Sequence, residues 1–115
     1  MKKEKRESTL LLKNLKPSDF GSDQAAKNVW ADQLTLLAED YRKANQYLDA
    51  GRLFSLVGEN GENYEKRAET LYKSGLLLFR AGRKQEAINS FQKASEDGNN
   101  LFYANLAKER LNQIQ

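Results

Sequence analysis

An internal repeat with a period of 37 residues is the feature that most limits how this chain can fold. A shift of 37 positions aligns identical residues at six places: Leu34 with Leu71, Ala44 with Ala81, Ala50 with Ala87, Phe54 with Phe91, Glu59 with Glu96 and Gly61 with Gly98. Periods of 20 to 50 residues are typical of proteins in which one small supersecondary unit stacks on the next. We therefore expect two copies of one structural unit.

Each copy has the apolar spacing of two helices. The pattern of the first helix stops near Asn45 in one unit and at Gly82 in the other, and both residue types tolerate the left-handed conformation that ends many helices. The second helices are expected at about Tyr47–Val57 and Lys84–Ala94, with turn residues after them. The residues expected to face inward are Trp30, Leu34, Leu37, Ala38, Tyr41, Tyr47, Ala50, Phe54 and Val57, then Ala68, Leu71, Gly75, Leu78, Ala87, Phe91 and Ala94.

A further amphipathic helix is expected at about residues 100–114, because apolar residues recur there at helical spacing. A stack of repeats ends in an apolar surface that must be covered. This helix is interpreted as the cover. The chain should therefore be all-α, with two antiparallel helix pairs at about 27–61 and 64–98 and a capping helix, in a domain of residues 23–115.

The residue inventory argues against catalysis and metal binding. The chain has no cysteine and no histidine, so the commonest zinc ligands, the usual general base and the thiol nucleophile are absent together. Glu59, Asn60, Glu62 and Asn63 lack the alternating oxygen ligands of a calcium loop. We expect no enzyme activity, no cofactor, no metal and no small-molecule substrate.

The second unit resembles the tetratricopeptide repeat family. The resemblance is carried by Leu71, Gly75, Leu78, Ala81, Gly82, Ala87, Phe91 and Ala94, and the first unit departs from the pattern at Gly51 and Val57. The family implies a right-handed α-solenoid and a scaffold that binds a partner peptide or helix in the concave groove lined by the first helices. Residues 103–111 are similar to the closing helix of bacterial tetratricopeptide proteins, including cell-envelope assembly factors.

The non-core face of the first helices supplies the candidate groove residues: Thr35, Glu39, Arg42 and Lys43 from one unit, and Tyr72, Leu76, Phe79 and Arg80 from the other. The second set is apolar where a solvated face should be polar. It therefore forms either an anchor site for an apolar partner side chain or a surface that packs on the last helix or on the leucines near the N-terminus.

The first 22 residues are interpreted as a largely flexible basic tail. Residues 1–16 hold six basic and two acidic side chains, and the whole chain carries +3, so the remainder is close to neutral at −1. The alternative function is an electrostatic binder of RNA or anionic lipid through this tail, which added salt would weaken steeply. The protein is expected to be cytoplasmic if Met1 is native, and periplasmic or envelope-associated if the chain is a fragment of an exported protein.

Two deletions test the expected organisation. Removing residues 1–8 should leave the melting temperature nearly unchanged, because a segment of Lys and Glu buries little apolar surface. Removing residues 101–115 should lower the melting temperature sharply or cause aggregation, because the apolar end of the stack becomes exposed. Equal tolerance of both deletions in a thermal melt would contradict the capping helix.

Overall fold

The computed structural model describes Leu15 and residues 17–115, and in this part of the chain every regular element is a helix. A short 3-10 helix, η1 (Pro17–Phe20), comes first. It is followed by five α-helices: α2 (Gln24–Lys43), α3 (Tyr47–Asn60), α4 (Arg67–Arg80), α5 (Lys84–Ser95) and α6 (Leu101–Ile114). The predicted all-α class and the five helices are confirmed.

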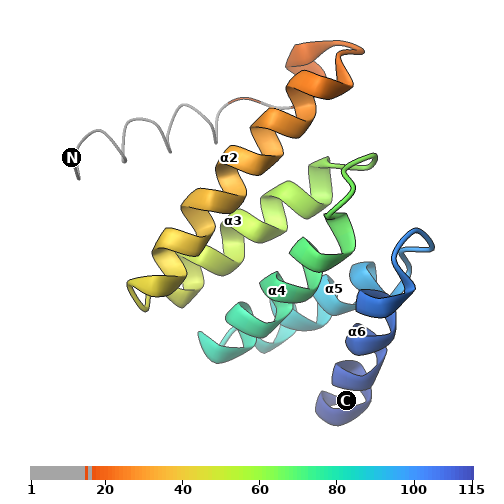
Figure 1. Cartoon of the computed structure of the whole chain (residues 1–115). Coiled ribbons are helices and arrows are strands. Elements are labelled where there is room, and N and C mark those ends of the chain that lie inside the picture. Colours follow the sequence, from red (N-terminus) through yellow and green to blue (C-terminus); the bar gives the residue numbers. More distant parts are fainter. Residues whose placement is uncertain (1–14, 16) are drawn as a thin grey trace.

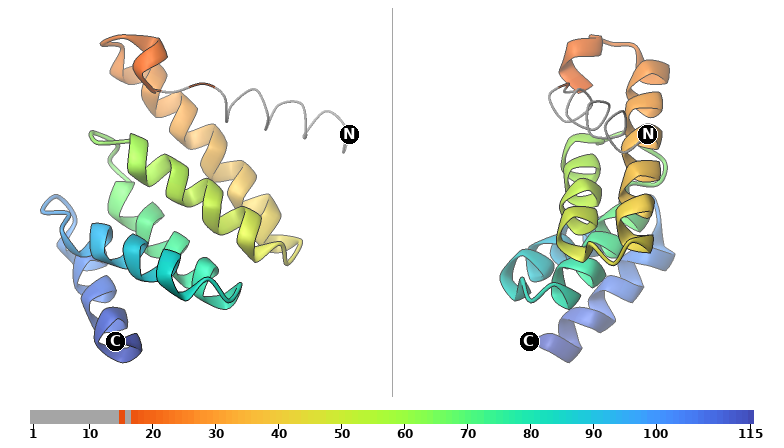
Figure 2. Two further views of the ribbon diagram at one scale, coloured as in Figure 1. Left: turned by 180° about the vertical axis from the view of Figure 1, so that it is seen from behind. Right: turned by 90° about the vertical axis from the view of Figure 1, so that its left-hand side faces the viewer.

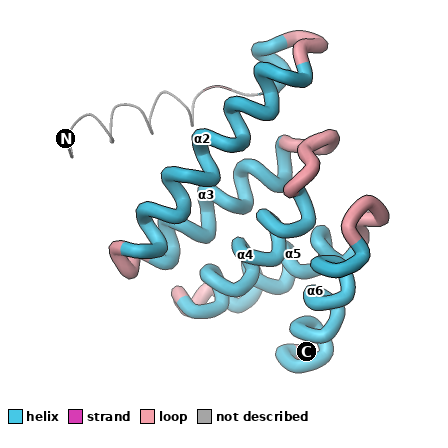
Figure 3. Tube along the Cα trace, in the orientation of Figure 1, coloured by secondary structure: helices cyan, strands magenta, loops and turns pink. Residues whose placement is uncertain are grey.

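The helices form two layers. Helices α2, α4 and α6 lie in one layer and α3 and α5 in the other, as the rear and side views show (Figure 2). The turns that join α2 to α3 and α4 to α5 lie at one end of the molecule, and the longer loops lie at the opposite end (Figures 1 and 3). Consecutive helices pack against each other, so each 37-residue unit contributes one antiparallel pair.

The two short turns have the same hydrogen bonds. The amide of Gln46 donates to the carbonyl of Tyr41 at 2.9 Å, and the amide of Arg83 donates to that of Leu78 at 2.8 Å, which is the same pair of positions 37 residues later. Asn45 and Gly82 have φ angles of 63° and 83°. Both therefore adopt the left-handed conformation, and the predicted C-terminal caps are confirmed.

One helix boundary was predicted wrongly. Helix α3 extends to Asn60 instead of ending at about Val57, so Gly58 lies inside the helix and not in the following loop. Gly58 is buried, and a Cβ atom at this position would collide with the side chain of Leu71 on α4. The glycine was misread as a turn signal because its packing partner is distant in sequence.

Glycines allow the central helices to approach closely. A Cβ atom on Gly51 of α3 would lie 2.9 Å from Cγ of Leu78, and one on Gly75 of α4 would lie 2.6 Å from Cε1 of Phe91. Non-bonded carbon atoms do not approach each other this closely. The contacts of α4 with α3 and with α5 therefore both depend on a missing side chain.

Apolar residues collect in two clusters on either side of this contact. The first is built mainly from α2 and α3 and includes Leu77 from α4, while the second joins α4, α5 and α6. The predicted inward residues are buried, or partly buried at Leu37, Tyr41 and Tyr47. Between the clusters, the Ser74 hydroxyl lies 2.8 Å from the carbonyl of Gly51 and 3.1 Å from the Ser90 hydroxyl, so this buried polar group is satisfied.

The two ends of the helix array differ. Helix α6 packs on both α5 and α4 and buries Ala104 and Ala107, while its outer positions Asn105 and Lys108 are exposed and polar. At the other end, η1 contacts α2, and the indole of Trp30 donates to the carbonyl of Leu15 at 3.0 Å. The predicted tail, residues 1–22, includes Leu15 and η1, so this part of it is not flexible but contacts α2, while residues 1–14 and 16 lie outside the described residues.

A glycine substitution tests the close contact of α4 with α5. Alanine favours a helix over glycine by about 1 kcal/mol, yet Gly75→Ala should destabilise the protein by about 1–2 kcal/mol, because its methyl group overlaps the Phe91 ring. The cost should shrink in a Phe91→Leu background. The loop variant Gly98→Ala, where nothing lies within 4 Å of the new atom, serves as the control. An equal cost in both backgrounds, measured by urea unfolding, would contradict the contact.

Candidate functional site

A groove of about 430 Å³ opens between α2 and α4. Residues from both helices line it: Glu39 and Arg42 from α2, and Lys73, Leu76, Leu77 and Arg80 from α4. Its position follows from the layer arrangement, because α2 and α4 lie in the same layer and α3 packs against both of them. Two leucines and four charged side chains thus meet on one surface of the molecule.

Ion pairs form along and across the groove, and the pair of Lys73 with Glu39 connects its two walls. Nε of Arg42 donates to Oε2 of Glu39 at 2.8 Å, and Nζ of Lys73 donates to Oε1 of the same carboxylate at 3.4 Å. Lys73 also lies 3.4 Å from the carboxylate of Glu69, one turn earlier on α4. Lys73 therefore bridges the two units, and Glu39 is shared by two cations.

The pKa of Glu39 reflects this arrangement. Its partial burial by itself would raise the pKa, but the hydrogen bond from Arg42 and the positive charges of Lys73 and Arg42 outweigh burial. The pKa of Glu39 consequently lies below its ordinary value of 4.5. Glu39 is therefore ionised at neutral pH, and its negative charge is already balanced by its two neighbours.

Leu76 and Leu77 provide the apolar part of the groove and have different surroundings. Leu77 is only 7% exposed and belongs to the first apolar cluster, whereas Leu76 is partly buried against the second. Next to them the guanidinium of Arg80 lies 4.3 Å from the centre of the Tyr47 ring. This stacking orients the Arg80 side chain while leaving the residue exposed.

The structure brings together four of the eight residues predicted for the groove: Glu39, Arg42, Leu76 and Arg80. Thr35 is partly buried and donates to the carbonyl of Ala31 at 2.8 Å, and Lys43 is exposed beyond the groove lining. These two residues lie on α2 but outside the groove.

Tyr72 and Phe79 have separate environments, although both were assigned to one surface. Tyr72 packs towards α6, with its ring centre 5.8 Å from that of Phe91 and 5.8 Å from that of Tyr103. Phe79 is 46% exposed and is not among the residues that line the groove. The alternative of packing on the last helix is thus confirmed for Tyr72 but does not describe Phe79.

Sequence reasoning missed Lys73 and Leu77 as groove residues. Neither residue was given a role from the periodicity. Position 77 lies between Leu76, which was predicted to face the groove, and Leu78, which was predicted to face inward. The spacing contained a signal for Lys73, which follows Glu39 by 34 residues. Glu86 follows Arg52, and Lys93 follows Glu59, by the same interval in ion pairs between the described parts of the two units.

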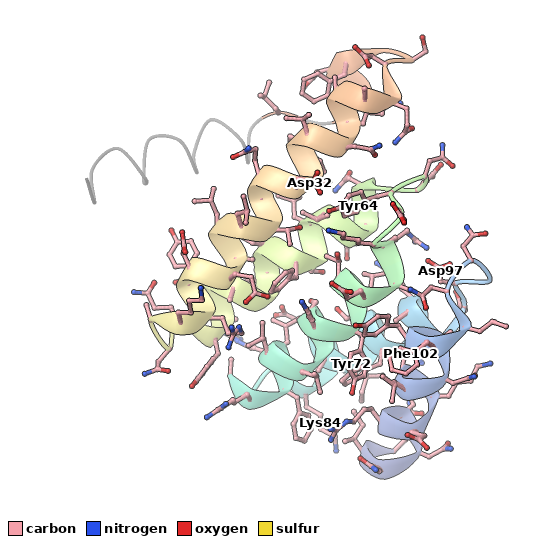
Figure 4. All side chains as sticks on the ribbon, viewed as in Figure 1. Asp32, Tyr64, Tyr72, Lys84, Asp97 and Phe102 are labelled. Carbon is pink, nitrogen blue, oxygen red and sulfur yellow. The ribbon has the colours of Figure 1, made fainter. Side chains whose placement is uncertain are left out.

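A second, more polar hollow of about 310 Å³ lies between the start of α2 and the loop after α3. Tyr64 borders it and donates its hydroxyl to Oδ1 of Asp32 at 2.5 Å (Figure 4). Burial, followed by this hydrogen bond to an anion, raises the pKa of Tyr64 to about 12. The bond therefore ties the loop to α2 across the whole physiological pH range.

No group of three or more acidic, histidine or cysteine side chains among the described residues is placed to hold a metal ion. No described helix is long and apolar enough to cross a membrane.

Comparison with known proteins gives no match: no protein-family model, curated protein or solved structure matches this chain.

Removing Lys73 should change the titration of Glu39. In the Lys73→Met variant one of the two cations that hold the carboxylate is lost, so the pKa of Glu39 should rise towards or above 4.5, as measured by NMR of the side-chain carboxyl carbon. Lys93→Met, which removes the partner of Glu59 instead, is the matched control and should leave the titration of Glu39 unchanged.

A depressed folded-state pKa stabilises the protein above the unfolded-state pKa, and this stabilisation is lost as the pH falls through the folded-state pKa. The stability difference between parent and Lys73→Met should therefore shrink as the pH falls below the ordinary value of 4.5 and through the lower folded-state pKa of Glu39. An unchanged Glu39 titration would show that Lys73 does not control this carboxylate.

Proposed function

We propose that the chain is a tetratricopeptide-type interaction domain that binds a segment of another polypeptide in the groove between α2 and α4. Three observations support the type of fold: the 37-residue repeat, the matching turns at Asn45 and Gly82, and the small residues where helices cross. In this proposal α6 is the capping helix, and the layer of α2, α4 and α6 forms the binding side.

The observation that carries the proposed function is an accessible apolar surface between charged groups. Leu76 lines the groove together with Arg42 and Arg80, and the exposed Phe79 lies one turn further along α4. Exposed aromatic and arginine side chains are the groups that contribute most to protein interfaces. A groove of about 430 Å³ also falls within the range of roughly 300–1,000 Å³ that is typical of ligand sites.

Binding is favoured over catalysis because the one acidic side chain that lines the groove is already paired with cations of the protein. Glu39 is paired with Arg42 and Lys73, and its pKa is shifted away from the neutral range in which a general acid or base works. Such pairs position side chains and set which partner charges are accepted.

A peptide selection followed by two matched variants tests this proposal. Peptides of about fifteen residues from a random displayed library are selected on the parent protein and then measured by fluorescence polarisation. Leu76→Ser should weaken their binding at least ten-fold, or about 1.4 kcal/mol, because the apolar contact surface of the groove is lost.

The control is Leu36→Ser, which removes a leucine that is 61% exposed on α2 outside the groove lining. It should leave binding unchanged, and circular dichroism melts should show that both variants fold. Failure to select any peptide, or equal binding by the groove variant and the parent, would refute this site.

A further inference from the structure

We propose that the partner segment is acidic and amphipathic, with a large apolar side chain that contacts Leu76 and side-chain carboxylates that pair with Arg42 and Arg80. This inference rests on the proposed function and adds the chemistry of the ligand. The groove, its charges and its apolar residues each supply one step of the argument.

The charges that line the groove favour an anionic partner. Three of the four ionisable residues that line it are cationic: Arg42, Lys73 and Arg80. The single anion, Glu39, is held by Arg42 at 2.8 Å and by Lys73 at 3.4 Å, so its charge is compensated within the protein. A cationic partner would have to compete with these two residues for Glu39, whereas an anionic one meets surplus positive charge.

Arg80 is the cation most available to a ligand. Its guanidinium stacks on the Tyr47 ring at 4.3 Å. The one acidic residue that lines the groove, Glu39, is paired with Arg42 and Lys73 instead. Stacking orients the plane of a guanidinium while leaving its edge N–H groups for hydrogen bonds, and this edge matches a carboxylate in bidentate geometry. Lys73 is less available, because it is shared between Glu39 and Glu69.

The positions of the two arginines indicate two carboxylates instead of one. Arg42 projects from α2 and Arg80 from α4, and Leu76 and Leu77 belong to the same groove lining. A ligand that uses all of these groups carries more than one acidic side chain close to an apolar one. An internal stretch of chain can supply that pattern, and a single terminal carboxylate cannot.

The size of the groove limits what enters it. A volume of about 430 Å³ is near the lower end of the usual range for ligand sites, which suits one or two large side chains and not a folded domain. Because Leu77 is nearly buried, the apolar contact to the partner falls mainly on Leu76.

Synthetic peptides of about twelve residues, acetylated and amidated at their ends, test the inference by fluorescence polarisation at about 0.15 M salt. The first carries a central Leu-Leu pair flanked by Glu residues, the second has Lys in place of every Glu, and the third has Ala in place of both Leu. The first should bind the parent protein at least ten-fold tighter than either of the others.

Matched charge reversals locate the contact. Arg80→Glu should weaken binding of the Glu-flanked peptide at least ten-fold, while Lys108→Glu, the same change at an exposed position of α6 outside the groove, should weaken it less than two-fold. Thermal melts of both variants should match the parent. Equal effects of the two reversals would overturn the inference.

Other outcomes separate this inference from the proposed function. The inference of an acidic partner is overturned if the Lys-flanked peptide binds at least as tightly as the Glu-flanked one, or if no peptide of the series binds. In either case the displayed-library selection still decides whether the groove binds peptides. A fourth peptide with a free C-terminal carboxylate and no Glu also tests the mode of recognition. If that peptide binds as tightly as the Glu-flanked one, a chain terminus is recognised. This result would overturn the inference that an internal segment of the partner is bound.

Discussion

The close contact of α4 with its neighbours on both sides is the constraint on which the rest of the structure depends. Gly51 and Gly58 let α3 approach α4, and Gly75 lets α5 approach it from the other side. Interiors are close-packed, so an added methyl group at any of these three positions must move a neighbour. The buried Ser74 hydroxyl, bonded to the carbonyl of Gly51, adds a polar contact that fixes how the two helices are aligned. Helix α4 thereby belongs to both apolar clusters, through Leu77 on one side and Leu71 and Leu78 on the other.

The groove is a consequence of that contact. Because α3 packs closely on α4, α2 and α4 come near each other in the same layer without close packing of their backbones, and long side chains span the interval between them. The Nζ atom of Lys73 lies 5.8 Å from the centre of the buried Phe54 ring, so its ammonium group contacts an aromatic face of the first unit and also reaches Glu39. Exposed ion pairs of this kind contribute less than about 1 kcal/mol each to stability. Their main effect here is to set the charge of the groove.

Sequence periodicity predicted the helices, the caps and most of the core, because these depend on local spacing and on residues with special backbone preferences. Asn45 and Gly82 were found in this way, and so were Phe54 and Phe91. The end of α3 was missed because a glycine reads as a turn signal unless its distant neighbour is known. The candidate site was predicted only in part. Helical spacing places Glu39, Arg42, Leu76 and Arg80 on the groove face. The directions of Tyr72 and Phe79 could not be predicted in this way, because they depend on where α6 crosses α4.

The two units also differ at equivalent positions, and this difference explains why the charged groove occurs where it does. Leu36 precedes Lys73 by one repeat of 37 residues. Lys73 pairs with Glu39 of the preceding unit, whereas Leu36 lies on α2, the first α-helix among the described residues, and is 61% exposed. A lysine is useful at this position only when an acid from a preceding helix lies within reach, because an isolated surface cation gains nothing from ion pairing. The groove therefore arises at the junction of the two units, where α4 meets a neighbour of the same kind, and neither unit would form this charge pattern on its own.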